Sequence, residues 1–285
     1  MKKLIPLFFA LIAMSCTKAQ HTGTLFSVPV GDYTVYLLSE GQREGNTNIL
    51  IGASPEMIAQ AIPNGTYSMA TNLFLVRTPN KNILIDTGFG RLLFDQLDSI
   101  GVKADEIDVI LITHMHGDHI GGLLNDGRRL FPNAKLYIAQ PEYVYWANTD
   151  NQQALQVLEV YKDQLILFSP NALTNLADSL LPGIFAIAAY GHTPGHTAFL
   201  IQSGNDQLLI WGDLAHAMAI QMPYPQVAVT YDVDPEEAVR SREAVLKYVS
   251  ENRIPVGGMH IAYPSVGKIQ PDNAGGYTFI PAIAK

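Results

Sequence analysis

The sequence has almost no cysteine, since Cys16 is the only one in 285 residues. A single thiol cannot form an internal disulfide, and the chain after position 16 offers no cysteine ligand to a metal. Long hydrophobic runs are also missing. The apolar stretch 4–14 is shorter than the roughly 20 residues that a bilayer-spanning helix needs, and nothing else in the chain approaches a membrane span.

Three common catalytic signatures and an excess of basic charge are absent as well. Neither a P-loop nor G-x-G-x-x-G occurs, which excludes a glycine-rich phosphate loop, and no G-x-S-x-G nucleophile elbow occurs. The chain carries 18 Lys and Arg against 26 Asp and Glu, a net charge of −8. This acidic balance disfavours nucleic acid and anionic membrane surfaces as partners.

The amino-terminal segment has the layout of an export signal. "MKKLIPLFFALIAMS" (1–15) contains two lysines, an apolar run and then small residues. Cys16 follows "AMS", which is similar to the lipobox of bacterial lipoproteins, whose mature chain begins at a diacylated cysteine. We therefore expect residues 1–15 to be a signal peptide and Cys16 to anchor the protein in the periplasm or outer membrane. Cleavage near Gln20 with free secretion, or a buried amino-terminal helix, are the alternatives.

The remaining chain predicts a short linker at 17–24 and one globular domain over 25–285. Apolar runs and alternation predict strands over 33–39, 71–78, 81–88, 107–113, 134–139, 183–190, 197–202, 207–213, 254–260 and 275–282. Helical patterns and caps predict helices over 53–62, 91–101, 141–165 in two pieces, and 234–252. Because both halves mix the two element types, we expect sheets in the middle with helices outside.

Polar clusters rich in histidine follow several predicted strands. "ITHMHGDHIGG" (112–122) comes at the end of the apolar run 107–113, and comparable positions come after 183–190, 207–213 and 254–260. Imidazole and carboxylate together are the ligands that zinc and similar metals prefer. Histidines that served only packing or solvation would not gather at strand ends. The sequence therefore predicts a metal site among His114, His116, Asp118, His119, His192, His196, Asp213 and His260.

These motifs resemble the metallo-β-lactamase superfamily. "LIDTG" (84–88), "THMHGDH" (113–119), "GHTPGH" (191–196), "WGD" (211–213) and "GGMH" (257–260) occur in the family's order. The resemblance implies an α/β fold of the αββα sandwich type, with two central β-sheets, helices outside and two metal ions at the edge between the sheets. It implies one metal on His114, His116 and His192, a second on Asp118, His119 and His260, and Asp213 as the bridge between them.

The resemblance also implies supporting residues and a mechanism. Asp86 would orient a ligand imidazole, His196 would hydrogen-bond or pack beside the ligands, and His216 would line the pocket, with metal ligation as its alternative. We expect two zinc ions, with manganese, iron or cobalt left open. Such a pair lowers the pKa of a shared water from about 16 to around 7, so that a bridging hydroxide can attack. Asp118 is expected to take a proton or steer that hydroxide.

The carboxy-terminal third narrows the expected substrate. "WGDLAHAMAIQ" (211–221), "DPEEAVRSREAVLKYV" (234–249) and "HIAYPSVG" (260–267) look like methyl parathion hydrolase and related N-acyl-homoserine lactone lactonases. The segment 39–62 fits that group too, in which it covers the pocket. We expect hydrolysis of a small lactone or ester, with a homodimer left open. A phosphotriester hydrolase and a lipid-anchored metal- or ligand-binding protein without turnover are the alternatives.

One departure concerns the loop after His260. Lys268 ends "PSVGK" (264–268), where these relatives often have histidine, which puts substrate contacts near this loop in doubt.

The export signal gives a first test. Mass spectrometry of the protein from its native host should find a chain that begins at a lipidated Cys16. An unmodified chain that begins near His21 would contradict the lipoprotein prediction and leave export intact.

Overall fold

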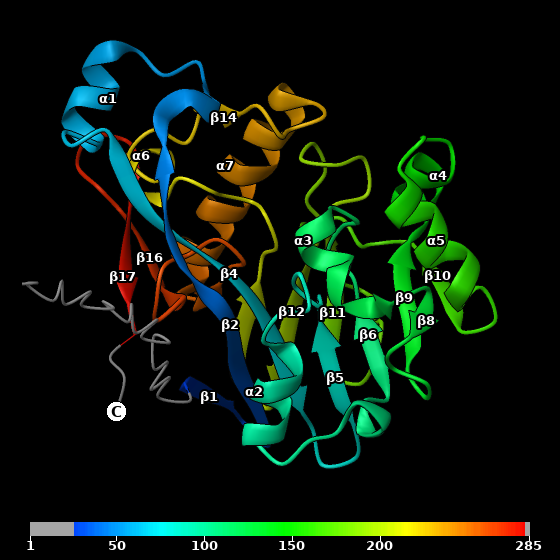
Figure 1. Cartoon of the computed structure of the whole chain (residues 1–285). Helices are drawn as coiled ribbons and strands as arrows, with labels where there is room; N and C mark the ends of the chain where they lie inside the picture. Colours follow the sequence, from blue (N-terminus) through cyan, green and yellow to red (C-terminus); the bar gives the residue numbers. More distant parts are fainter. Residues whose placement is uncertain (1–25, 283–285) are drawn as a thin grey trace, which may run out of the picture.

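The computed structural model describes residues 26–282 (Figure 1). The predicted signal peptide 1–15, Cys16 and the linker 17–24 lie outside the described residues. Within 26–282, no helix combines the length and apolar character needed to cross a bilayer.

Two sheets form the centre of the molecule. The first has seven strands in the order β1-β2-β4-β5-β6-β9-β10, and the second has six in the order β11-β12-β13-β15-β16-β17. The strands of the first are Phe26–Val30, Tyr33–Asn46, Thr66–Arg77, Asn82–Ile85, Val109–Leu111, Lys135–Ala139 and Leu165–Phe168. Those of the second are Ile184–Ala188, Thr197–Ser203, Asp206–Ile210, Val256–Gly257, Val266–Pro271 and Tyr277–Pro281. Two short pairs, β3 (Leu50–Ile51) with β14 (Ala228–Val229) and β7 (Leu124–Asn125) with β8 (Arg128–Arg129), lie beside them.

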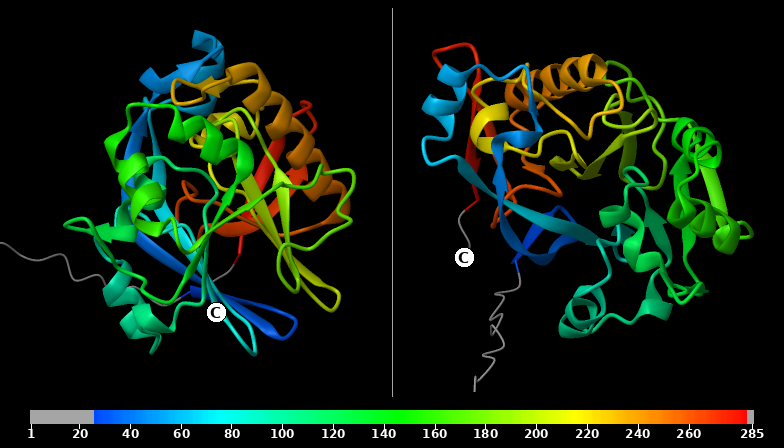
Figure 2. Two further views of the ribbon diagram at one scale, coloured as in Figure 1. Left: turned by 90° about the vertical axis from the view of Figure 1, so that its right-hand side faces the viewer. Right: turned by 45° about the horizontal axis from the view of Figure 1, so that its top comes forward.

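Helices cover the outer faces of both sheets. The described helices are α1 (Pro55–Ala61), α2 (Leu93–Ser99), α3 (Gly117–Ile120), α4 (Gln140–Ala147), α5 (Gln152–Tyr161), α6 (Met218–Gln221) and α7 (Pro235–Asn252), of which α2, α4, α5 and α7 form these outer layers. Trp146 of α4 and Leu158 of α5 pack on the first sheet, whereas Leu246 of α7 packs on the second. Figure 2 shows α7 on one side of the strands and α2 on the other.

A continuous apolar core joins the two sheets. Phe74 and Ile83 of the first sheet pack with Phe199 and Ile210 of the second, and all four are at most 1% exposed. Burial of such side chains contributes roughly 1.5–3 kcal/mol each, so this layer holds the sheets face to face. The four layers confirm the predicted αββα sandwich.

Local sequence signals set the helix boundaries. The Ser54 hydroxyl accepts a hydrogen bond from the Met57 amide and caps α1, whose first residue is Pro55. Asp234 caps α7 in the same way through the Glu237 amide. These caps lie where the sequence predicted them.

Several strands differ from the prediction. Strands β1, β10 and β16 of the two main sheets were not predicted, and Leu165, the last residue of a predicted helix, begins β10. Strand β2 extends beyond residue 39 to Asn46, because it remains paired with β4 past a bulge between Ser39 and Gln42. The β2–β4 ribbon therefore rises beyond the sheet toward α1 (Figure 1).

The ends of several strands meet at one edge of the sandwich. β5, β6 and β9 run parallel in the first sheet, and β13 runs parallel to β15 in the second. The carboxyl ends of parallel strands lie at the same edge, so the loops that follow them come together. These loops carry the predicted metal residues.

Candidate metal centre

Nitrogen atoms of three histidines lie close together on one side of the site. His116 Nδ1 lies 2.9 Å from His114 Nε2 and 3.0 Å from His192 Nε2. His114 and His116 follow β6 of the first sheet, whereas His192 follows β11 of the second. We call these three residues the histidine triad.

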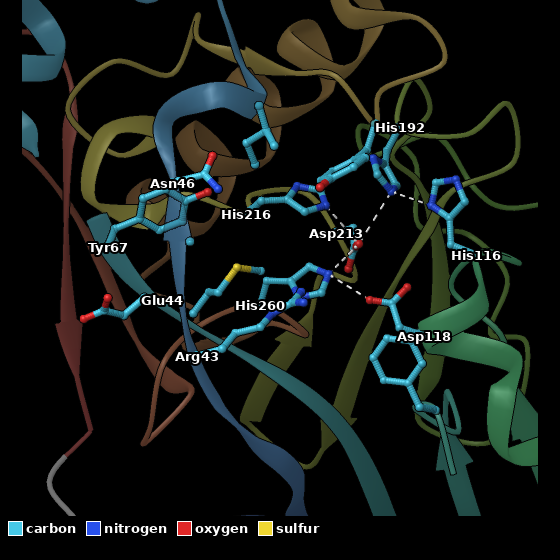
Figure 3. Close-up of a pocket in the computed structure, with 15 residues that line it drawn as sticks. Arg43, Glu44, Asn46, Tyr67, His116, Asp118, His192, Asp213, His216 and His260 are labelled. Atoms are coloured by element: carbon cyan, nitrogen blue, oxygen red, sulfur yellow. Dashed lines mark hydrogen bonds and ion pairs between the residues drawn. The ribbon is translucent and has the colours of Figure 1, made fainter. Parts of the chain in front are cut away.

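A mixed triad lies beside the first. Asp118 Oδ1 lies 3.7 Å from His119 Nε2, and Asp118 Oδ2 lies 3.5 Å from His260 Nε2. Asp118 and His119 belong to the short helix α3, and His260 comes after β15. Asp118 is 20% exposed and reaches the cavity, while both histidines are buried (Figure 3).

Asp213 lies between the two triads. Its Oδ1 is 3.3 Å from His119 Nε2, and its Oδ2 is 2.9 Å from His260 Nε2. The same Oδ2 is 3.5 Å from His192 Nε2 and 3.7 Å from His114 Nε2. One carboxylate therefore reaches nitrogens of both triads, and Figure 3 shows it at the centre of the group.

The chain around Asp213 is held by His196. The Asp213 amide donates to His196 Nε2 at 2.9 Å, and His196 Nδ1 donates to the Ala189 carbonyl at 2.7 Å. Burial lowers the pKa of His196 to about 4, so the neutral ring can accept one bond and donate the other. A Cβ on Gly212, at φ +62°, would lie 2.4 Å from His196 Nε2, so only glycine fits.

Buried acceptors orient three of the imidazoles. Asp86 Oδ2 lies 2.6 Å from His119 Nδ1, and Asp232 Oδ1 lies 2.8 Å from His192 Nδ1. The Ala70 carbonyl lies 2.8 Å from His260 Nδ1. An Nδ1 that donates outward leaves the Nε2 lone pair facing the centre, as a metal ligand requires. Asp86 therefore contacts the imidazole of His119, a predicted ligand, while the contact between Asp232 and His192 was not predicted.

His216 lies on the cavity side of Asp213. Its Nε2 is 3.1 Å from Asp213 Oδ2, and its ring stacks on that of His260 with centroids 4.8 Å apart. It lines the cavity, and its donor atoms also group with those of His192 and Asp213. Both predicted roles, pocket wall and ligand, agree with this position.

The electrostatics suit a cation. Burial lowers the pKa of His114 and His192 well below the usual value and that of His116 to about 4, so the histidine triad is neutral. Burial alone would raise the pKa of Asp213, but the surrounding histidines hold it well below its usual range. Burial alone would lower the pKa of His119, but Asp213, Asp86 and Asp118 raise it well above the usual value. The carboxylates of Asp86, Asp118 and Asp213 therefore create a negative electrostatic potential among the imidazoles.

Several buried polar atoms make no hydrogen bond to the protein. Within the described part of the chain these are His119 Nε2 and Asp213 Oδ1, which face each other at 3.3 Å, and His216 Nδ1. Buried polar atoms rarely remain unsatisfied, so such atoms indicate a bound group. The ligand atoms of each triad lie within 4.8 Å of one another. The neutral imidazoles of the histidine triad, and the imidazoles and carboxylate of the mixed triad, fit divalent metal ions.

One buried carboxylate near the site was not predicted. Glu142 Oε1 accepts from the Met115 amide at 2.8 Å and from the Trp146 indole. Its Oε2 accepts from the Thr193 hydroxyl at 2.6 Å and the Gly195 amide at 3.0 Å. Glu142 therefore ties the loop that carries His114 and His116 to the loop that carries His192.

Replacement of this carboxylate gives a test of that tie. Each carboxylate oxygen of Glu142 accepts from two donors. In Glu142→Gln one of these oxygens is replaced by an NH2 group, so two of the donors lose their acceptor in either orientation of the amide. We expect the free energy of unfolding to fall by roughly 2–4 kcal/mol, because each unsatisfied buried donor costs about 1–3 kcal/mol. Denaturant unfolding measures this.

Glu159→Gln is the matched control, because Glu159 is 71% exposed on α5 and pairs only with Lys162. Its unfolding midpoint should stay at that of the unmodified protein. Equal midpoints for the two variants would show that Glu142 does not hold the loops.

A cavity of about 370 Å³ opens over the triads. Residues 43–46 and Ile49, within the segment predicted to cover the pocket, form part of its wall. Lys268, which replaces the histidine of related sequences, is exposed on β16 and is not among the cavity residues.

Comparison with known proteins identifies the family. Residues 67–253 match the model of the metallo-beta-lactamase superfamily. The hydrolase AbOPH of the beta lactamase superfamily shares the fold, with a TM-score of 0.83 and 23% identity over 92% of this chain and 98% of that one. The dizinc quorum-quenching lactonase AidC has a TM-score of 0.82 and 26% identity over 91% and 97%.

Curated sequence relatives match over shorter regions. Exodeoxyribonuclease WalJ of Streptococcus pneumoniae is 34% identical over 87 residues, 29% of this chain and 32% of that protein. The N-acyl homoserine lactonase of Bacillus cereus is 28% identical over 117 residues, 40% of each chain. This chain thus spans less than half the length of these relatives. Since the family model covers well over half of the chain, the protein belongs to the metallo-beta-lactamase superfamily of hydrolases.

Proposed function

We propose that the protein uses two metal ions to hydrolyse a lactone or a carboxylic ester. The observation that carries this proposal is Asp213, whose carboxylate lies 2.9–3.7 Å from nitrogens of both triads. A single-metal site would not need a carboxylate between two sets of ligands. Further support comes from AidC, a dizinc lactonase to which this chain is similar over 91% of its length.

The two triads would each hold one ion. In this proposal the histidine triad holds the first, the mixed triad of Asp118, His119 and His260 holds the second, and Asp213 contacts both. When bound, two divalent ions polarise a carbonyl oxygen and lower the pKa of a water to around 7. Zinc is the proposed metal, because neutral imidazole and carboxylate are its common ligands in proteins.

The protein's own residues would position the reactants. Asp118 reaches the cavity and would accept a proton from the attacking water and return it to the leaving oxygen. Asp86 and Asp232 keep their histidine partners in one tautomer, so the ligand atoms stay in place during turnover. Ile49, Met69, Phe89 and Tyr231 give the cavity an apolar side, which would bind the hydrocarbon part of the substrate.

Replacement of Asp213 tests the two-metal proposal. Asp213→Asn keeps the size of the side chain but removes the charge that offsets repulsion between two cations. We expect a folded protein that loses about one metal equivalent and about a hundredfold in kcat/KM, which corresponds to about 2.7 kcal/mol of transition-state stabilisation. Elemental analysis and ester hydrolysis measure these two changes.

Asp206→Asn is the control, because Asp206 lies at the other end of the same strand and is exposed. It should keep the metal content and rate of the unmodified protein. Equal metal content and rate in Asp213→Asn would contradict the bridging role.

A substrate panel tests the reaction class. Lactones or aryl esters should be hydrolysed at least about tenfold faster than β-lactams or glutathione thioesters, judged by kcat/KM, a discrimination of about 1.4 kcal/mol. A faster rate with phosphotriesters would favour the methyl parathion hydrolase type of activity. No turnover with any class would favour a binding protein. Export with a lipid anchor at Cys16 remains part of the proposal and is tested separately.

A further inference from the structure

The cavity extends beyond the two triads to a polar group on the β2–β4 ribbon. Arg43, Glu44, Asn46 and Tyr67 line this part (Figure 3), together with the apolar side chains of Ile49 and Met69. None of the four polar residues belongs to the proposed metal centre.

The strand register places Arg43 and Tyr67 on the same side of the ribbon. Arg43 pairs with Met69, and Gly45 pairs with Tyr67, so these alternate positions share one face, whereas Glu44 and Asn46 lie on the other. Tyr67 and Met69 are buried, whereas Ser68 between them is exposed. A Cβ on Gly45 would lie 2.5 Å from the Tyr67 ring, so the glycine leaves room for the ring to lie across the ribbon.

The Tyr67 hydroxyl has no partner among the described residues. The residue is only 6% exposed, and its oxygen is buried and makes no hydrogen bond. A buried hydroxyl without a partner is costly, which indicates that something else binds it. Burial raises the pKa of Tyr67 to about 12, so the hydroxyl keeps its proton and can donate at neutral pH.

Arg43 is a second donor on this face. Its side chain is exposed, and within residues 26–282 no carboxylate lies within 4.0 Å of its guanidinium. Figure 3 shows Arg43 pointing from β2 toward His260. Asn46 uses its side-chain oxygen to accept from the Asn48 amide, which leaves its NH2 group available as a third donor.

We propose that Arg43 and Tyr67 form a subsite for a carboxylate that the substrate carries apart from its reacting carbonyl. The inference rests on the proposed function and adds a substrate class to it: lactones or esters with a free carboxylate. On the face of the ribbon that carries Arg43 and Tyr67, both polar groups are donors and one is cationic, which matches an anion with two acceptor oxygens. Glu44 also borders the cavity but lies on the other face of the ribbon, and Figure 3 shows its carboxylate pointing away from the two triads. A neutral acyl chain would leave the buried hydroxyl unpaired.

A matched pair of esters tests the subsite. The 4-nitrophenyl monoester of glutaric acid and 4-nitrophenyl pentanoate have the same chain length but differ in the terminal carboxylate. We expect kcat/KM to be at least tenfold higher for the glutarate ester, and Arg43→Gln to remove this preference while the pentanoate rate stays within twofold. Tyr67→Phe should reduce the preference by a smaller factor. Arg77→Gln, at the other end of β4, is the control and should change neither rate.

Equilibrium binding gives a readout that does not need turnover. Calorimetric titration should find glutarate bound at least tenfold more tightly than pentanoate by the metal-loaded protein, and equally weakly after Arg43→Gln. If both esters are hydrolysed at equal rates and the two acids bind equally, the subsite is wrong and the proposed function stands. If neither ester is hydrolysed but the glutarate preference depends on Arg43, the reaction class is wrong and the subsite stands.

Discussion

Five imidazole nitrogens lie within 2.9–3.7 Å of the Asp213 carboxylate, and the side chains that carry these groups are all buried. A buried carboxylate is unstable unless opposite charge or hydrogen bonds surround it. The histidines that meet this need come from both sheets, so the contact forms only when the sandwich is assembled. The apolar layer between the sheets, the chain geometry at Gly212 and the outward bonds of His119, His192 and His260 all serve to keep these groups together.

The centre is therefore rigid before any substrate enters. Asp86 and Asp232 fix two imidazoles from outside, and Glu142 joins the two loops that carry the histidine triad. The opposite wall of the cavity comes from residues 43–46 and Tyr67 of the β2–β4 ribbon, which make no hydrogen bond to the proposed metal ligands within the described chain, whereas Ala70 of β4 accepts from His260. In the proposed function, a fixed set of metal ligands is thus separate from a wall that contacts the substrate. This division agrees with a superfamily in which one fold supports several hydrolytic reactions.

Much of this arrangement could be predicted from the sequence, because its signals are local. The apolar run before His114 and the cap at Asp234 each lie within a few residues, and the family's motifs occur in order. Glu142 and Asp232 could not be found in this way, since their partners are up to 53 residues distant and neither lies in a recognisable motif. The extension of β2 was missed because its residues 40–46 are mostly polar and the pairing with β4, rather than the local pattern, holds them extended.

In the proposed mechanism, two ions lie on either side of Asp213. Anomalous scattering at the zinc edge, from a crystal of the zinc-loaded protein, would locate them. We expect two peaks, one among His114, His116 and His192 and the other among Asp118, His119 and His260, with Asp213 in contact with both. A single peak, or a second peak that Asp213 does not touch, would contradict this mechanism.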